Sequence, residues 1–261
     1  MHLKKFNPVN NSLRHHINIQ KSILVKTSIL LKTLSKGLKR FYGRSSITGR
    51  ITVRHKGGGC KRVYKKISFI NSNKKLGLVL ATFYDSFRTG FVSLIYNYLN
   101  KGFFFTLATA NIYPGTLIYN NLPLNELKLG CSFVLNKIPA GSLIHCLSTK
   151  NKYSTFIRSA GTFGQLIQKS SLKNLIRLPS GKIVDVNSNS IMSLGILSNV
   201  SHSSIVVGSA GRNRRLGKRP SVRGIAMNPV DHPHGGRTNG GRPSVTPWGI
   251  PTKGKPTVKK K

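Results

Sequence analysis

Two histidines beside an aspartate are the residues of this sequence that most resemble a catalytic group. Asp231, His232 and His234 stand in the segment Asp-His-Pro-His. A carboxylate next to an imidazole can tune the histidine as a general base. Catalysis would also need a nucleophile, donors for a developing negative charge and a pocket, and the sequence around His232 shows none of these. We therefore predict no catalytic residue, and an acyl-transfer enzyme that uses His232 is the weakest alternative.

Cysteine and histidine occur as two close pairs, His55 with Cys60 and His145 with Cys146. A zinc site needs four suitably spaced ligands, and neither pair has two more nearby. The third cysteine, Cys131, stands alone and no Cys-x-x-Cys pair occurs, so we expect reduced thiols and no disulfide framework. We predict no metal site and no cofactor.

Acidic residues are almost absent: the four are Asp85, Glu126, Asp185 and Asp231. Paired-carboxylate hydrolysis, two-metal phosphoryl transfer and carboxylate calcium sites all need several acids, so these classes are excluded. No Gly-x-x-x-x-Gly-Lys-Ser/Thr motif occurs, which excludes a P-loop NTPase. The sequence therefore predicts that the protein is not an enzyme.

The net charge points to a polyanionic partner. The 261 residues contain 43 Lys and Arg against four acids, a formal charge of +39. A compact chain of that charge repels itself unless a polyanion neutralises it, and nucleic acid is the obvious candidate. Residues 1–75 hold 19 of the cations and 208–261 hold 13. The apolar stretch 91–113 is interrupted by polar residues and Gly, so we expect a soluble protein without a membrane partner.

The middle of the chain, 45–207, has the pattern of short β-strands. Runs rich in Val, Ile, Leu, Phe, Tyr and Thr alternate with Gly, Asn, Pro and Ser. This pattern predicts two consecutive small all-β barrels, with one continuous β-sandwich as the alternative. A short turn of helix is expected within 189–201. The predicted strands are 49–54, 64–69, 76–84, 90–98, 103–108, 116–119, 132–135, 142–147, 153–157, 163–168, 174–177 and 182–186.

The two ends of the chain have a different composition. Residues 208–261 contain ten of the 26 glycines and seven of the 12 prolines. That density predicts an extended tail without regular helix or central strand. The first 44 residues are basic, and we expect an extended arm there.

A glycine-rich motif follows the basic arm. In 48–66 a strand that alternates Arg50, Thr52 and Arg54 precedes three glycines, 57–59, and then a second basic strand. Exposed backbone N–H groups at the glycines can approach phosphate, while Arg and Tyr offer forked donors and stacking faces. The alternative is a basic hairpin with a flexible loop.

The tail carries the most specific motif. Residues 219–236 read Arg-Pro-Ser-Val-Arg-Gly-Ile-Ala-Met-Asn-Pro-Val-Asp-His-Pro-His-Gly-Gly. This run closely resembles the C-terminal extension of the universal large-ribosomal-subunit protein L-two family. Residues 49–59 resemble the family's first signature, and 138–142 with 158–162 resemble its central one, in the family's order. The resemblance covers about 40–257. Two departures are Cys60, where the family commonly has His, and a few residues absent before Arg237.

The resemblance implies a fold and a function. It implies an oligonucleotide-binding-type (OB-fold) barrel, then an SH3-like barrel, with basic arms that enter large-subunit rRNA near the peptidyl transferase region and the subunit interface. The expected parts are a basic arm (1–44), the OB-like barrel (45–113), the SH3-like barrel (114–207) and an rRNA-binding tail (208–261). In that family RNA performs the chemistry, so His232 and His234 would hydrogen-bond and stack on RNA.

The prediction is therefore a structural constituent of the large ribosomal subunit. Its partners would be large-subunit rRNA, other large-subunit proteins and small-subunit rRNA at an intersubunit bridge. The sequence is also compatible with structural magnesium shared with the RNA. A chromatin-like basic DNA-binding protein is the alternative. Abundant Asn, Lys, Ile, Ser and Phe, with the departures above, favour a mitochondrial ribosome over the bacterial cytoplasm or a plastid.

The predicted RNA-binding residues lie in both motifs, the strand after the glycines, the central signature and the tail. Specificity would come from RNA shape rather than from a base code. They are Arg50, Arg54, His55, Lys56, Gly57, Gly58, Gly59, Lys61, Arg62, Tyr64, Lys65, Arg158, Arg212, Arg214, Arg215, Lys218, Arg219, Arg223, Asn228, His232, His234, Arg237, Arg242, Trp248, Lys253 and Lys255.

Overall fold

The computed structural model divides the chain into two compact units. Unit 1 combines 1–40 with 60–212, and unit 2 combines 41–59 with 213–261. Unit 2 thus joins residues of the predicted arm and first barrel with the predicted tail. The structure describes residues 3–20, 22, 24–25, 33–38, 42–68, 75–120, 127–150, 153–237 and 242–254.

Unit 1 contains all the named strands. Among the described residues these are β1 (Leu3–Lys5), β2 (Ile17–Ile19), β3 (Ser35–Leu38), β4 (Arg62–Lys65), β5 (Lys75–Phe83), β6 (Val92–Asn97), β7 (Gly102–Leu107), β8 (Leu117–Asn120), β9 (Ser132–Val134), β10 (Leu143–His145), β11 (Leu147–Lys150), β12 (Tyr153–Phe156), β13 (Gly164–Gln168), β14 (Lys173–Arg177), β15 (Ile183–Asn187) and β16 (Ile191–Leu194).

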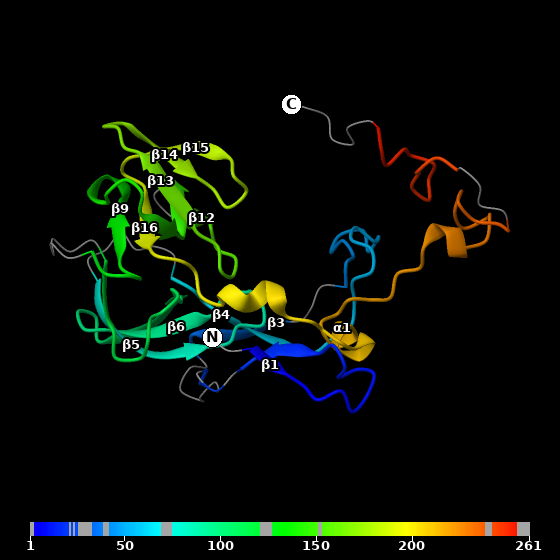
Figure 1. The fold of residues 1–261 in the computed structure, drawn as a ribbon, viewed down its shortest axis with the longest axis horizontal. Helices are drawn as coiled ribbons and strands as arrows, with labels where there is room; N and C mark the ends of the chain where they lie inside the picture. The colour runs from blue at the N-terminus through cyan, green and yellow to red at the C-terminus, as the bar shows by residue number, and fades with distance from the viewer. Residues whose placement is uncertain are drawn as a thin grey trace. The chain divides into compact units, whose positions relative to one another are not determined.

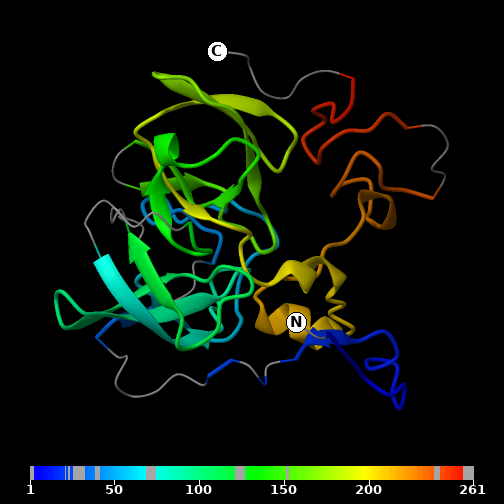
Figure 2. The same cartoon turned by 60° about the vertical axis from the view of Figure 1, so that its left-hand side comes forward.

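Most strands belong to one long curled sheet. Its order is β15-β14-β13-β10-β16-β9-β8-β5-β6-β7. Strands β5 to β8 form the first part, the teal region of Figure 1, and β9 to β16 form the second, green to yellow. A single parallel pair, Asn120 opposite Ser132, links β8 to β9. Figure 2 shows how strongly both parts curl. The all-β prediction, with an OB-like first part and an SH3-like second part, is confirmed.

The alternation of side chains explains why these segments are strands. In β14, Asn174 and Ile176 are fully buried while Lys173 and Arg177 are exposed. A strand presents successive side chains to opposite faces, so Asn174 and Ile176 share the inner face of β14 while Lys173, Leu175 and Arg177 share the outer one. Antiparallel pairing with β15 sets the register of the strand, with Arg177 opposite Ile183.

Two apolar clusters form the core of unit 1. The larger one extends from the second part into the first and contains Val79, Ile95 and Tyr119 beside Phe133 and Leu166. Edge-to-face packing joins the Tyr119 and Phe133 rings, whose centroids are 5.7 Å apart. The smaller cluster centres on the first part, with Phe83, Val92, Leu94, Phe105, Leu107 and Leu197. The two barrels therefore share apolar packing.

The predicted N-terminal arm is not simply extended. Strands β1 and β2 pair with each other, and β3 pairs with β4. The His16 ring contacts Phe6 edge-on at 4.7 Å, and its Nε2 lies 3.3 Å from Nη1 of Arg212. Backbone pairing of Ile17 with Val206 adds to this contact. The described part of the predicted arm therefore contains three short strands, each of which belongs to an antiparallel pair.

Two local predictions are wrong, and a third is met only in part. Residues 49–54 form turns, because Gly43 and Gly49 have φ of 70° and 65°, and a Cβ at Gly43 would collide with the Val53 carbonyl. Of the helical turn expected within 189–201, only the start of a 3₁₀ turn at 200–201 is present, whereas 191–194 form strand β16, because pairing with β9 and β10 buries Met192. The tail, in contrast, contains a helix, α1 (Ala210–Arg215), ahead of its glycine- and proline-rich part.

Short 3₁₀ turns complete the described elements: η2 (Leu135–Lys137), η3 (Val200–Ser204) and η4 (Gly224–Ala226). No helix in the described part of the chain is long and apolar enough to cross a membrane.

Candidate nucleic-acid interface

Unit 2 has no hydrophobic core in its described part. Its buried residues there are Gly57, Gly217, His232 and Gly235, and none of them has an aliphatic side chain. In Figure 1 the orange-to-red chain is almost entirely loop. Hydrogen bonds, mostly between backbone groups, therefore hold this unit together, and most of its side chains are exposed. The exposed cations are Arg44, Arg50, Arg54, Lys56, Arg214, Arg215, Lys218, Arg219, Arg223, Arg237, Arg242 and Lys253.

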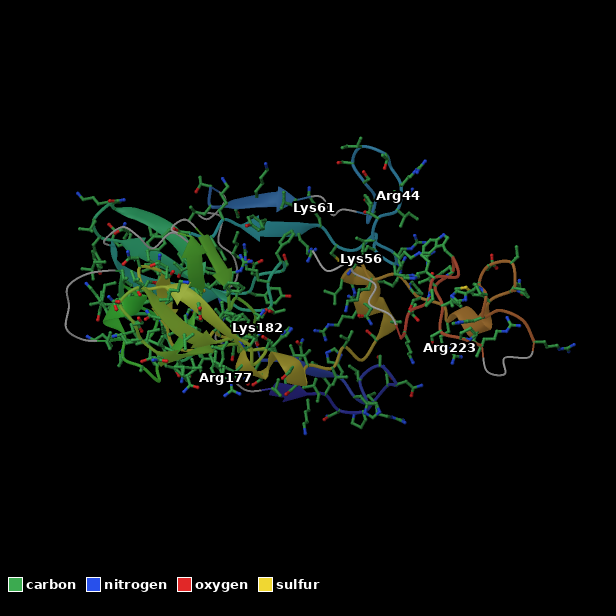
Figure 3. The ribbon with its side chains drawn as sticks, turned by 90° about the horizontal axis from the view of Figure 1, so that it is seen from above. Arg44, Lys56, Lys61, Arg177, Lys182 and Arg223 are labelled. Carbon is green, nitrogen blue, oxygen red and sulfur yellow. The ribbon has the colours of Figure 1, made fainter. Side chains whose placement is uncertain are left out.

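The glycine-rich motif and the tail pair directly, although 165 residues separate His55 from Pro220. Gly57 N–H donates to the Gly217 carbonyl at 3.1 Å, and Arg219 N–H donates to the His55 carbonyl at 3.0 Å. The His55 ring Nδ1 donates to the Pro220 carbonyl at 3.0 Å. This pairing brings two predicted RNA-binding segments together. In Figure 3, Lys56 lies on the glycine-rich motif, Arg44 just before it and Arg223 on the tail.

Arg54 and Trp248 also meet across these segments. The guanidinium carbon of Arg54 lies 4.6 Å from the centre of the Trp248 ring, and Trp248 is 70% exposed. Guanidinium and indole planes are both faces on which RNA bases stack. The pair thus forms an open stacking surface that carries positive charge.

The Asp-His-Pro-His segment forms a tight turn. Its buried His232 accepts a hydrogen bond at Nδ1 from the His234 N–H at 3.0 Å. Arg242 donates from Nη1 to the Pro233 and Gly235 carbonyls at 2.6 and 2.7 Å. Gly224 packs against the His232 ring so closely that a Cβ would approach it to 2.7 Å. Packing and backbone contacts therefore explain why His232 is buried in this turn.

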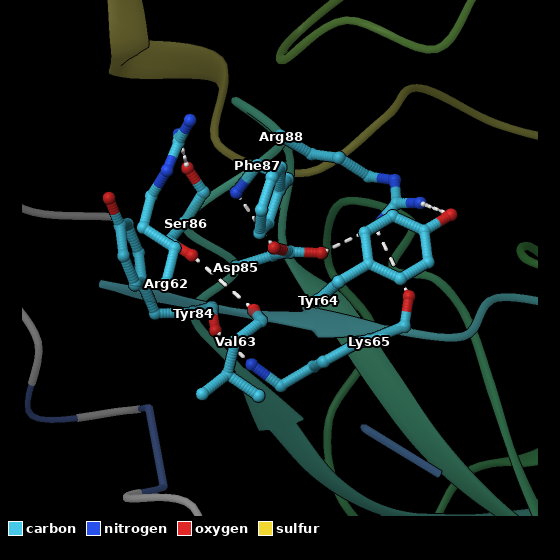
Figure 4. A network of polar contacts seen from close by, with 9 residues as sticks. All are labelled: Arg62, Val63, Tyr64, Lys65, Tyr84, Asp85, Ser86, Phe87 and Arg88. Atoms are coloured by element: carbon cyan, nitrogen blue, oxygen red, sulfur yellow. Dashed lines mark hydrogen bonds and ion pairs between the residues drawn. The ribbon is translucent and has the colours of Figure 1, made fainter. Parts of the chain in front are cut away.

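The strand after the glycines has a different environment, shown in Figure 4. Asp85 is fully buried and accepts from Arg88 at 2.6 Å and from the Phe87 N–H at 2.9 Å. Arg88 also donates to the Tyr64 hydroxyl at 2.9 Å. One of the four acids thus holds the loop after β5 against strand β4.

Two predicted RNA-binding residues serve this network. Arg62 donates to the Ser86 carbonyl at 2.8 Å and stacks on the Phe87 ring at 4.4 Å. Lys65 is only 4% exposed and donates to the Tyr84 carbonyl at 2.5 Å. Burial lowers the pKa of the Lys65 ammonium, with Asp85 acting in the opposite direction and Arg88 adding to the decrease. The burial of Lys65 argues against a direct contact between its ammonium group and RNA.

The remaining predicted residues are mostly at the surface. Lys61, Arg158 and Asn228 are exposed, as are the cations of unit 2 named above. Tyr64, Arg212 and His234 are half-buried, and Lys255 lies outside the described residues. Their RNA-binding roles remain predictions. Tyr42 and Arg44, which were not predicted, line the same surface as Lys56, and the signal was their basic and aromatic character immediately before the first motif.

His145 and Cys131 are both buried in unit 1. His145 is fully buried, its Nε2 lies 2.8 Å from the Thr109 hydroxyl, and burial lowers its pKa to about 3. Burial also raises the pKa of the Cys131 thiol, and no disulfide involves any cysteine. Within the described residues, no group of three or more His, Cys, Asp or Glu could hold a metal ion.

Comparison with known proteins identifies the family. Residues 31–120 match "Ribosomal Proteins L2, RNA binding N-terminal domain", and 128–249 match "Ribosomal Proteins L2, C-terminal domain". The chain is 43% identical over 267 residues to "Large ribosomal subunit protein uL2m" of Reclinomonas americana, covering 100% of this chain and 95% of that protein.

Bacterial relatives are similar to nearly the same degree. "Large ribosomal subunit protein uL2" of Parvibaculum lavamentivorans is 41% identical over 98% of this chain and 93% of its own length. The protein of the same name from Rickettsia felis is also 41% identical, over 100% of this chain and 96% of its own. The chain therefore belongs to the ribosomal protein L2 (uL2) family, a family of structural, RNA-binding components of the large ribosomal subunit.

Proposed function

We propose that this protein binds large-subunit rRNA close to the peptidyl transferase region and supports subunit association and translation without catalysing a reaction. One observation carries this proposal: the described part of unit 2 exposes its cations around a single acid, Asp231, and buries no apolar side chain. A segment of that kind gains little stability from its own burial, so neutralisation by RNA phosphates would supply the main attraction.

Sedimentation and salt release test the RNA-binding part. We expect the tagged chain to co-sediment with the large subunit and to dissociate as salt rises, because counterion release drives phosphate binding. Large-subunit rRNA should compete for the free protein far better than duplex DNA of the same charge. Equal competition would instead favour a chromatin-like DNA-binding protein.

The role near the peptidyl transferase region needs a separate experiment. Large subunits would be assembled with His232→Gln, and assembly and single-turnover peptide-bond formation would be measured independently. We expect any defect to appear in assembly, because His232 is buried in a turn of the tail. Normal assembly with abolished peptide-bond formation would contradict a non-catalytic role. Subunit association would be followed in the same particles by the fraction that joins small subunits.

We propose the mitochondrial ribosome as the location. The similarity to a mitochondrial relative and the composition of the chain support it, while bacterial relatives are almost as similar. Fractionation of the source cells tests this: recovery in the large subunit of purified mitochondria is expected, and recovery in cytoplasmic or plastid ribosomes would contradict it.

A further inference from the structure

Two neighbouring cavities lie within unit 2 and share part of their walls. One has a volume of about 420 Å³ and the other about 510 Å³. Both fall in the size range of small-ligand sites. The shared residues are Tyr42, Arg44, Lys56 and Arg219.

The smaller cavity is suited to an anion. Arg214 joins three of the shared residues, Arg44, Lys56 and Arg219, so four cations and no acid line it. Arg44 donates to the Gly49 carbonyl at 2.9 Å. Among the described residues, the side chains of Lys56, Arg214 and Arg219 have no hydrogen bond or ion pair with the protein. Cations gathered in this way repel one another unless an anion lies between them.

The glycines add an open stretch of backbone to this cavity. Gly58 has φ of 62°, and a Cβ built there would meet nothing within 4 Å. Gly57 is buried, and its N–H is already bonded to the Gly217 carbonyl. At Gly58 a phosphate oxygen could therefore approach the main chain closely.

The larger cavity has a different lining. Ile51, Val53 and Val222 line it while remaining 59%, 50% and 59% exposed, and Met227 and Pro247 complete its apolar wall. The Tyr42 and His232 rings belong to the same lining. Apolar and aromatic surface left open in this way fits the flat face of a nucleobase.

We infer that the two cavities together bind one unstacked nucleotide of single-stranded RNA, with its phosphate in the cationic cavity and its base in the apolar one. The inference rests on the proposed RNA binding and specifies the form of RNA that this part of the protein takes. A duplex does not fit, because its bases remain stacked and paired inside the helix. A peptide of acidic residues alone would satisfy the cations and leave the apolar wall uncovered.

A strand without bases distinguishes the contributions of the two cavities to binding. Binding of the full chain to hexauridylate and to a ribose-phosphate hexamer without bases would be measured by fluorescence anisotropy over a range of salt. We expect about tenfold tighter binding of hexauridylate, which is within the contribution of one stacked base. Equal affinity for the two strands would overturn the inference, while absence of salt-dependent binding to either would overturn the proposed RNA binding itself.

Two variants assign the preference to the cavities. Val222→Gln occupies the apolar cavity with a longer polar side chain that offers no stacking face, so it should abolish the preference for hexauridylate and leave binding of the abasic strand unchanged. Arg214→Ala with Arg219→Ala should weaken both strands and reduce the salt slope by about 1.4, the value for two phosphate contacts on single-stranded RNA. An unchanged preference in Val222→Gln would place the base elsewhere and overturn the inference.

Matched controls come from unit 1. Leu172→Gln introduces the same side chain at a residue that is 78% exposed, and Lys173→Ala with Lys182→Ala removes the same charge. Both controls should retain the hexauridylate preference. Hexaglutamate serves as a competitor: displacement as effective as that by hexauridylate would favour an acidic peptide and overturn the inference.

Discussion

Units 1 and 2 are stabilised in opposite ways. Every described buried apolar side chain lies in unit 1, where Phe133, Leu166 and Ile176 are at most 2% exposed. Unit 2 is held by backbone hydrogen bonds and by contacts such as that of Arg242 with the Pro233 carbonyl. Burial of apolar surface is the main favourable contribution to folding, so unit 1 should be stable by itself and unit 2 should depend on its partner.

The comparison also explains where the charges lie. Unit 1 tolerates a buried carboxylate because Asp85 is paired with Arg88 and bonded to the Phe87 N–H. Unit 2 leaves its cations exposed and gives them almost no acid to pair with. An RNA-binding surface needs its cations available, whereas a folded core needs its charges satisfied.

A core substitution should show the largest difference between the units. Phe133→Ala is expected to lower the free energy of unfolding by about 3–5 kcal/mol, because it removes a buried ring and leaves a cavity. Val230→Ala, at a residue of unit 2 that is 90% exposed, should change it by less than about 0.5 kcal/mol. Urea unfolding of the full chain measures both. Similar losses from the two variants would contradict the contrast.

Removal of the buried acid should have the next largest effect. Asp85→Ala leaves Arg88 and the Phe87 N–H without their acceptor, and we expect a loss of about 3 kcal/mol. Asp85→Asn should lose less, since its amide oxygen can still accept from Phe87. The exposed Asp185→Ala is the control and should be nearly neutral in the same unfolding experiment. A neutral Asp85→Ala would show that the network in Figure 4 contributes little.

Acid should destabilise unit 1 through His145. Its pKa of about 3 in the folded protein lies below the ordinary value of 6.5, so the unfolded chain binds the extra proton between these pH values. Stability is therefore full above pH 6.5 and falls as the pH decreases toward 3. Between pH 7 and pH 5 we expect His145 to lower the free energy of unfolding by about 2 kcal/mol.

Urea titrations at several pH values test this contribution. His145→Gln should remove that part of the pH dependence, and the exposed His15→Gln should retain it. The same pH dependence in wild type and His145→Gln would contradict the assignment to His145.

The smallest effect on global stability should come from the tail. Arg242→Ala removes two hydrogen bonds to carbonyls of the Asp-His-Pro-His turn. We nevertheless expect the free energy of global unfolding to fall by less than about 0.5 kcal/mol, because the described part of unit 2 buries no apolar side chain. Hydrogen exchange at Gly235 and Gly236 should become faster, whereas Lys253→Ala should leave it unchanged. A large global loss would show that the tail contributes to the stability of unit 1.

Much of the fold follows from local patterns. Short runs rich in Val, Ile and Leu, such as 174–177 and 182–186, are sufficient to predict strands, because such residues fit the half-buried surface of a sheet. Ile191–Leu194 belongs to the sheet because it pairs with β9, although its flanking residues are rich in Ser and Asn. The turns of 42–54 depend on the left-handed conformations of Gly43 and Gly49, which a composition-based strand assignment does not detect.

The sequence by itself determined the charge, its concentration at the two ends, the all-β character and the family, because these depend on residue types and on motifs that are contiguous along the chain. Only the tertiary structure decided which cations are available. It placed Lys65 in a buried contact with Tyr84 and brought His55 beside Pro220. Burial and long-range pairing depend on residues distant in sequence, so no local pattern could separate a cation that serves the fold from one that is free to bind RNA.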